Sequence, residues 1–249
     1  MSTPELVFLI AIFFFTSVIS VVTGSTSLIT VPAMISLGME PHIAIATNML
    51  ALTFMSVGGS LPFIRNGAIR RSNLPVSIFL TVVGSGLGAL LLFTVPVRAL
   101  RLTIAVAMIA VTVFTIANRD MGLPTREVPV TRWAVLTGYL MTFLLAVYGG
   151  FFSGGYVTML TASFVVLFGM SFLQSVATTK VVNVFSSAVA TTVFLSRGVV
   201  NWKLGVILGI AMFCGAMLGG RIALQLSSTW LRRIFIVAVL GLAIKMLLP

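Results

Sequence analysis

The sequence contains the polar stretch Thr23-Gly24-Ser25-Thr26-Ser27 between a long apolar run, Leu6 to Val22, and a short one, Leu28 to Leu37. A second stretch of this kind, Gly149-Gly150-Phe151-Phe152-Ser153-Gly154-Gly155, also precedes a short apolar run, Val157 to Phe168. Runs of about 10 to 12 residues rise about 15 to 18 Å as helices, which is half the hydrocarbon thickness of a bilayer. Each break is therefore expected to open a half-length helix or a re-entrant hairpin.

The composition places almost the whole chain in a lipid bilayer. Of 249 residues, 59% are hydrophobic and 8% are charged, whereas about a quarter of the residues of a soluble domain are charged. Lipid leaves backbone groups without hydrogen bonds, so spanning segments must be helices or a closed barrel. Runs such as Leu6 to Val22 lack the alternation of barrel strands. The sequence therefore predicts an all-α polytopic membrane protein and excludes a water-soluble domain.

The net charge of +11 comes from Lys and Arg residues that lie mostly in short loops between apolar runs. This distribution is typical of topology signals and argues against nucleic acid as a partner. Residues Met1 to Glu5 lack the basic region of a signal peptide, so we expect the first helix to be retained. Cys214 is the one cysteine and cannot form a disulfide within the chain.

The chain repeats itself at an offset of 131 residues, which aligns Gly24 to Asn118 with Gly155 to Pro249 without a gap. Paired positions include Gly38 with Gly169 and Gly67 with Gly198. We therefore predict two tandem homologous transmembrane repeats, residues 1–118 and 133–249, joined by a linker at 119–132. The apolar runs predict about eight spanning helices plus two short broken or re-entrant helices.

The orientation of the two repeats depends on the short segments. If these segments do not span, each repeat has four spans and the repeats run parallel; if they span, each has five and the repeats are inverted. Both arrangements place eight loop Lys and Arg residues inside and four outside, so charge counting does not separate them. We favour eight full spans plus two short elements.

The two breaks are the strongest indication of a binding site. Paired polar breaks beside unusually short helices mark the substrate sites of many transporters, and free amides at a helix N-terminus suit an anion. The alternative is that small residues only allow helices to pack closely. For the breaks we favour ligand binding; we favour packing for the later glycines Gly84, Gly86, Gly88, Gly215, Gly219 and Gly220.

Lys180 is the most informative single residue. It follows Ala177-Thr178-Thr179, about 12 Å into the apolar run that starts at Phe172. A charge at this depth is costly and usually functional. The second repeat contains no carboxylate, so we expect an anionic ligand. The alternatives are a lysine that lines a wet cavity or one that pairs with Glu40.

The sequence predicts no catalytic, metal or cofactor site, because the chain has one His, one Cys and no carboxylate pair within the membrane. Glu40 and His42 flank Pro41 in a turn. One interpretation gives them a gating or proton-linked role, and the other treats them as ordinary loop residues. The predicted substrate-binding residues are those of the two breaks and of the helices that follow them: Thr23, Gly24, Ser25, Thr26, Ser27, Thr47, Asn48, Gly149, Gly150, Ser153, Gly154, Gly155, Thr178, Thr179, Lys180 and Asn183.

The breaks, Pro32, the Gly-Met turns and the Ala-Thr pairs together resemble the TauE/SafE family of membrane permeases over nearly the whole chain. Ala177-Thr178-Thr179-Lys180 fits the second-half pattern of that family, whereas the first break has one glycine where several are usual. The resemblance implies transport of sulfite, a sulfonate or a related organosulfur anion.

We therefore expect a secondary transporter for a small anion in a bacterial-type cell inner membrane. An anion channel and a non-transporting membrane scaffold remain as alternatives. The expected partners are the anionic substrate and the lipid bilayer, and a homo-oligomer is left open.

Overall fold

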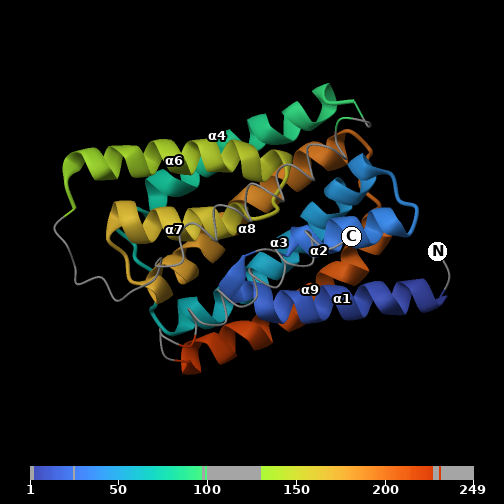
Figure 1. Cartoon of the computed structure of the whole chain (residues 1–249), viewed down its shortest axis with the longest axis horizontal. Helices are drawn as coiled ribbons and strands as arrows, with labels where there is room; N and C mark the ends of the chain where they lie inside the picture. The colour runs from blue at the N-terminus through green and yellow to red at the C-terminus, as the bar shows by residue number, and fades with distance from the viewer. Residues whose placement is uncertain (1–2, 25, 97–98, 100–129, 227–229, 231–249) are drawn as a thin grey trace, which may run out of the picture.

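The computed structural model describes residues 3–24, 26–96, 99, 130–226 and 230, and the regular structure in these residues is entirely helical. The helix bounds lie within a few residues of those expected from the apolar runs. In chain order (Figure 1) the elements are α1 (Thr3–Thr23), α2 (Ser27–Ser36), α3 (Pro41–Arg65), α4 (Leu74–Leu91), the 3-10 turn η1 (Leu92–Thr94), α6 (Arg132–Phe151), α7 (Tyr156–Phe168), α8 (Phe172–Ser196) and α9 (Trp202–Gln225).

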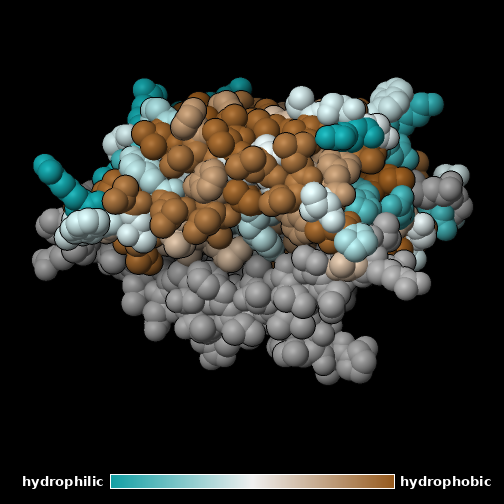
Figure 2. Space-filling view, turned by 90° about the horizontal axis from the view of Figure 1, so that it is seen from above, coloured by the Kyte–Doolittle hydropathy of each residue, from teal (hydrophilic) through white to brown (hydrophobic). Residues whose placement is uncertain are grey.

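Six of the described helices are long and apolar enough to cross a membrane: α1, α3, α4 with η1, α6, α8 and α9. The helices α2 and α7 are short, as predicted. The last apolar run of each predicted repeat, Leu102 to Ala117 and Ile234 to Leu248, accounts for the other two of the eight predicted spans. Both runs lie outside the described residues, as does the linker up to residue 129. Figure 2 shows an apolar band with polar residues at both ends, as expected for a protein in a bilayer.

Local sequence signals fix where several helices begin. Ser171 and Gln174 form a capping box at the start of α8, and Asn201 accepts a hydrogen bond from the Leu204 amide at the start of α9. Pro41 is the first residue of α3, where its missing N–H costs nothing. These local signals define where α3, α8 and α9 begin.

Close contacts between the helices give their relative directions. Gly205 and Gly209 of α9 face Leu50 and Phe54 of α3 in rising order, so α3 and α9 are parallel. In the same way α1 is parallel to α9, and α4 is parallel to α6. By contrast, α8 runs antiparallel to α3, because Asn183 contacts Ser56 and Thr191 contacts Thr53.

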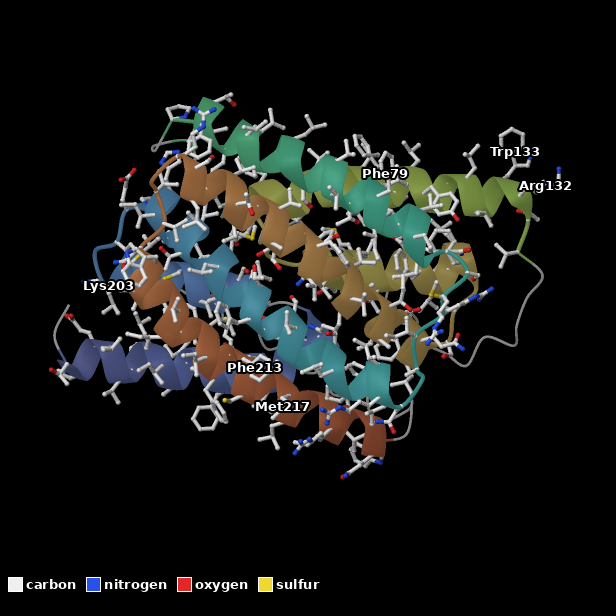
Figure 3. The ribbon with its side chains drawn as sticks, turned by 180° about the vertical axis from the view of Figure 1, so that it is seen from behind. Phe79, Arg132, Trp133, Lys203, Phe213 and Met217 are labelled. Carbon is white, nitrogen blue, oxygen red and sulfur yellow. The ribbon has the colours of Figure 1, made fainter. Side chains whose placement is uncertain are left out.

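The molecule therefore has two ends. The starts of α1, α3 and α9 define the Lys203 end, and the starts of α4, α6 and α8 define the Arg132 end. Figure 3 shows Arg132 and Lys203 at opposite ends of the long axis.

The short helices reverse the chain without spanning. The end of α2 lies beside the start of α1, where Met34 and Leu37 line one cavity with Glu5 and Leu9. Similarly, the end of α7 packs on the start of α6, where Phe168 faces Gly138. The hairpins α1–α2 and α6–α7 thus enter from opposite ends (Figure 1). The starts of α1 and α6 lie at opposite ends, so the parallel arrangement expected from four spans per repeat is wrong. That expectation counted only crossings, whereas α2 and α7 turn the chain back without crossing.

Several local geometries follow the 131-residue offset. The Asn201 amide donates to Thr47 Oγ1 at 3.1 Å, and the Arg70 amide donates to Thr178 Oγ1 at 3.3 Å. The two donors are 131 positions apart, and so are the two acceptors. In the described residues, the glycines with positive φ form three pairs at the same spacing: Gly24 and Gly155, Gly38 and Gly169, Gly67 and Gly198. Residues at matching places in the two halves therefore adopt matching conformations.

Four of the later glycines allow close helix packing, as expected. A Cβ atom at Gly88 would overlap the Val147 carbonyl oxygen, and one at Gly219 would overlap the Val18 carbonyl oxygen. The glycines are 131 residues apart but their partners are 129 apart. The second break therefore contains two more residues than the first, which is why the ungapped alignment begins only at Gly24.

Replacing Gly88 with Ala should destabilise the protein because the methyl group would push α4 away from α6. Overpacking of this kind costs about 1–3 kcal/mol. The matched control is Gly86→Ala on the same helix, where the nearest atom to an added Cβ is Val189 Cγ1 at 3.6 Å. Thermal unfolding of the purified protein in detergent should show a lower Tm for G88A than for G86A. Equal Tm values would contradict the contact between α4 and α6.

Candidate functional site

The two breaks meet inside the protein. Gly24 and Gly155 have φ angles of 74° and 78°, in the left-handed region that side chains with a Cβ rarely adopt. The hydroxyls of Ser27 and Ser153 are 2.6 Å apart. The Thr158 hydroxyl donates to the Thr23 carbonyl oxygen at 2.6 Å. The polar groups of each break are thus satisfied partly by the other break, as irregular backbone at membrane depth requires.

The N-termini of α2 and α7 face this junction from opposite sides. From the junction, α2 runs toward the Lys203 end and α7 toward the Arg132 end. Neither helix has a side-chain hydrogen bond at its N-cap, which is Thr26 in α2 and Gly155 in α7. Amides in the first turn of a helix have no partner within the helix, and the helix dipole is positive there. Two positive helix ends therefore converge on the same place.

The Lys180 ammonium lies beside the junction and is 2% exposed. Its Nζ atom donates to the Ser20 carbonyl oxygen of α1 at 2.9 Å. The C-terminal end of α1, where Ser20 lies, carries the negative end of a helix dipole and so favours a cation. This contact uses one of the three ammonium donors.

The described carboxylates do not neutralise Lys180. Glu5 and Glu40 lie at the Lys203 end of the molecule, where Glu40 contacts His42 at 3.2 Å. About 15 Å of the helix α2 separates Glu40 and His42 from the first break. The alternative in which Lys180 pairs with Glu40 is therefore wrong, since Lys180 is held by a backbone carbonyl.

A small pocket lies between the breaks and α8. Its free space is about 10 Å³, which holds about one water molecule. The described conformation is thus closed to anything larger than water. The lining residues come from both halves of the chain: Gly24, Thr26, Ser27, Leu52, Met55, Ser153, Val157, Lys180 and Asn183.

A second layer of hydrogen bonds orients the polar lining. Asn48 Nδ2 donates to Ser27 Oγ at 2.8 Å, and Thr30 donates to Asn48 Oδ1 at 2.7 Å. Asn183 Nδ2 donates to Ser56 Oγ at 2.6 Å. Asn48 is therefore positioned to support the site and not to line it.

Thr179 occupies the position equivalent to Asn48 in the other half. Its hydroxyl lies 3.0 Å from that of Thr161, which is the equivalent of Thr30. Thr179 is thus also in the supporting layer.

Other predicted site residues have different surroundings. Thr47 and Thr178 accept hydrogen bonds from loop amides near the two ends of the molecule. Gly149 packs on the Tyr156 ring and Gly150 on the Ser85 backbone. Gly154 packs on Leu28 and its carbonyl oxygen accepts from Tyr148. Ser25 lies outside the described residues.

Several residues of the site were not predicted from the sequence. Ser20 contributes a backbone carbonyl, which no side-chain pattern can indicate. Ser56 supports Asn183, and Leu52, Met55 and Val157 complete the lining. Thr30 and Thr161 could have been found, because both are threonines at matching positions of the 131-residue offset.

This arrangement defines a class of protein. Polytopic helical membrane proteins with short helices whose N-termini meet inside the bundle are typical of transporters. The family model described as sulfite exporter TauE/SafE matches residues 9–246. The chain belongs to the TauE/SafE family, which confirms the resemblance inferred from the sequence, and it is a membrane transporter.

Curated relatives carry consistent names. A probable membrane transporter protein of Sinorhizobium is 31% identical over 97% of this chain and 92% of its own length. A probable membrane transporter protein of Haemophilus influenzae is 27% identical over 97% of this chain and 94% of its own. The probable membrane transporter protein YfcA of Escherichia coli is 27% identical over 91% of this chain and 83% of its own. No solved structure matches the chain.

The contact between the two breaks predicts a disulfide. In a Cys214→Ser background, the double variant Ser27→Cys/Ser153→Cys should form a disulfide on mild oxidation, because the two hydroxyls are 2.6 Å apart. The control pair is Ser27→Cys/Ser163→Cys, in which the second cysteine lies about 10 Å along α7 from its first residue, Tyr156. Free thiols counted by intact mass after alkylation should disappear in the first pair only. Equal oxidation of both pairs would contradict the junction.

Proposed function

We propose that the protein is a secondary transporter that binds a small anion, either sulfite, a sulfonate or a related organosulfur anion, in the pocket between the two breaks. The observation that carries this proposal is the Lys180 ammonium. It is buried, it contacts one carbonyl oxygen, and two helix N-termini without side-chain caps lie beside it. A buried cation without a carboxylate partner is costly, and an anionic ligand removes that cost.

The chemistry of the lining suits an oxyanion. Lys180 has ammonium donors left after its contact with Ser20, and Ser27 and Ser153 supply hydroxyls. The N-termini of α2 and α7 add the positive ends of two helix dipoles. A sulfonate or sulfite group carries three oxygen acceptors, so it can accept from several of these donors at once. The sulfur class itself is suggested by the family name.

We further propose that residues 1–118 and 133–249 are inverted repeats that move relative to each other to give alternating access. The opposed hairpins α1–α2 and α6–α7 and the contacts at the 131-residue offset support this proposal. The pocket admits about one water molecule in the described conformation, so an anion can reach it only after a conformational change. That requirement favours a carrier over an open channel.

The loop charges support an orientation. Among the described residues, Arg65, Arg70, Arg71 and Arg132 lie in loops or helix ends at the Arg132 end, and Arg197 and Lys203 lie at the opposite end. Positive residues accumulate on the cytoplasmic side, so we assign the Arg132 end to the cytoplasm of a bacterial-type cell with the protein in the inner membrane. An inside-negative potential then favours anion export by about 2.3 kcal/mol per charge per 100 mV.

Replacing Lys180 with Met, the residue at the equivalent position 49, should weaken anion binding without unfolding the protein. The Ser20 carbonyl keeps the Gly24 amide as a donor at 2.9 Å, so no buried group is left unpaired. Loss of a charged hydrogen bond of about 1.5–3 kcal/mol corresponds to roughly 10- to 100-fold in Kd. Titration calorimetry with sulfite should show this loss for K180M but not for the exposed control K203M. Unchanged binding by K180M would refute the anion site, and a scaffold would bind no anion in either form.

The substrate class can be tested by thermal shift of the wild-type protein. Sulfite and sulfonates should raise the Tm because they bind the folded state. Sulfate and short carboxylates serve as comparison anions. Stabilisation by carboxylates alone would remove the sulfur assignment while leaving the anion site.

A further inference from the structure

A second group of polar side chains lies outside the pocket. Within the described part of the chain, the hydroxyls of Ser77, Thr81, Tyr156 and Ser175 are buried. Those of Ser77 and Ser175 have no hydrogen-bond partner, whereas those of Thr81 and Tyr156 are in contact with each other. Each of these residues is at most 1% exposed. A buried polar group without a partner is destabilising, and native structures contain few. The two unpaired serines therefore require an explanation.

These hydroxyls form a line from the Arg132 end to the middle of the protein. On α4, Ser77, Thr81 and Ser85 follow each other at four-residue spacing and so share one helix face. Ser77 lies in the first turn of α4, and Ser85 lies about 16 Å from its start. Ser175 occupies the first turn of α8 on the facing helix.

The inner end of this line reaches the neighbourhood of the pocket. Ser85 and Ser186 share a hydrogen bond of 2.7 Å, and the Tyr156 hydroxyl lies beside Thr81 and Ser186. Ser186 is one helical turn from Asn183, which lines the pocket. The hydroxyl line therefore connects the Arg132 end of the protein with the proposed binding site.

Apart from Tyr156, whose equivalent is Ser25, the equivalent positions of the other half are apolar. The five Ser and Thr residues of the line on α4 and α8 are Ser77, Thr81, Ser85, Ser175 and Ser186. The residues 131 positions away from them, in α9 and α3, are all buried and apolar: Leu208, Met212, Ala216, Ala44 and Met55. The same packing position thus accepts apolar side chains at the Lys203 end. Packing alone does not explain the hydroxyls at the Arg132 end.

We propose that the hydroxyl line is one wall of an aqueous path between the pocket and the Arg132 end, and that the seam between α3 and α9 stays dry. In the described conformation α4, α7 and α8 close the path, and displacement of the hairpin α6–α7 opens it. Water or the hydrated anion then supplies the missing hydrogen-bond partners. This inference rests on the proposed transport function, since a path is needed only if something crosses.

Cysteine labelling tests the path. In the Cys214→Ser background, Ser77→Cys and Thr81→Cys place thiols on the line, and Leu208→Cys and Met212→Cys are their equivalents on the dry seam. Arg71→Cys and Lys203→Cys mark the two ends. A charged, membrane-impermeant methanethiosulfonate is added to each side of sealed vesicles in turn, and labelling is followed by mass.

The path predicts that S77C and T81C react from the side on which R71C reacts, at least 10-fold faster than L208C and M212C. Equal reactivity of T81C and M212C would overturn the proposal, and so would unreactive S77C and T81C in vesicles where R71C is labelled. Circular dichroism of each variant confirms that it is folded.

The labelling needs no substrate, so its outcome separates the two proposals. Labelled S77C and T81C together with unchanged sulfite binding by K180M would keep the path and remove the anion site. Unlabelled S77C and T81C together with weak sulfite binding by K180M would remove the path and keep the site.

Discussion

A helical backbone that breaks inside a bilayer must find hydrogen-bond partners within the protein, because lipid supplies none. This constraint accounts for the arrangement of the described helices. Each break is satisfied partly by the other, through the contacts between Ser27 and Ser153 and between Thr158 and Thr23. The two hairpins must therefore reach the same depth from opposite ends. The N-termini of α2 and α7 then converge beside Lys180, which gives a positive site without a nearby carboxylate.

Much of the fold could be predicted from the sequence. The apolar runs gave the helices to within a few residues, because in a bilayer hydrophobicity and helix formation coincide. The short runs marked α2 and α7 correctly as half-length helices. Matching glycines indicated matching turns, since positive φ at Gly24 and Gly155 restricts both positions to glycine. Lys180, Ser27, Ser153 and Asn183 were predicted as site residues, and the structure brings them to one pocket.

The remaining features depend on contacts between distant segments. The relative direction of the two halves could not be predicted from loop charges, because both arrangements place eight Lys and Arg residues inside and four outside. Thr47 and Thr178 look like ligand donors in the sequence, yet each binds a loop amide of the opposite half. The hydroxyl line on α4 and α8 forms no recognisable motif in the sequence. Its asymmetry matters only because the structure shows that both these hydroxyls and their apolar equivalents in the other half are buried.

The central claim is that an anion binds between the breaks beside Lys180. The most direct test is a crystal structure with a brominated sulfonate, whose bromine can be located by anomalous scattering. We expect a sulfonate within hydrogen-bond distance of Lys180 Nζ, with Ser27 and Ser153 also in contact. A sulfonate held elsewhere, for example in the groove that Arg65 and Arg221 line at the Arg132 end, with an empty central pocket, would contradict it.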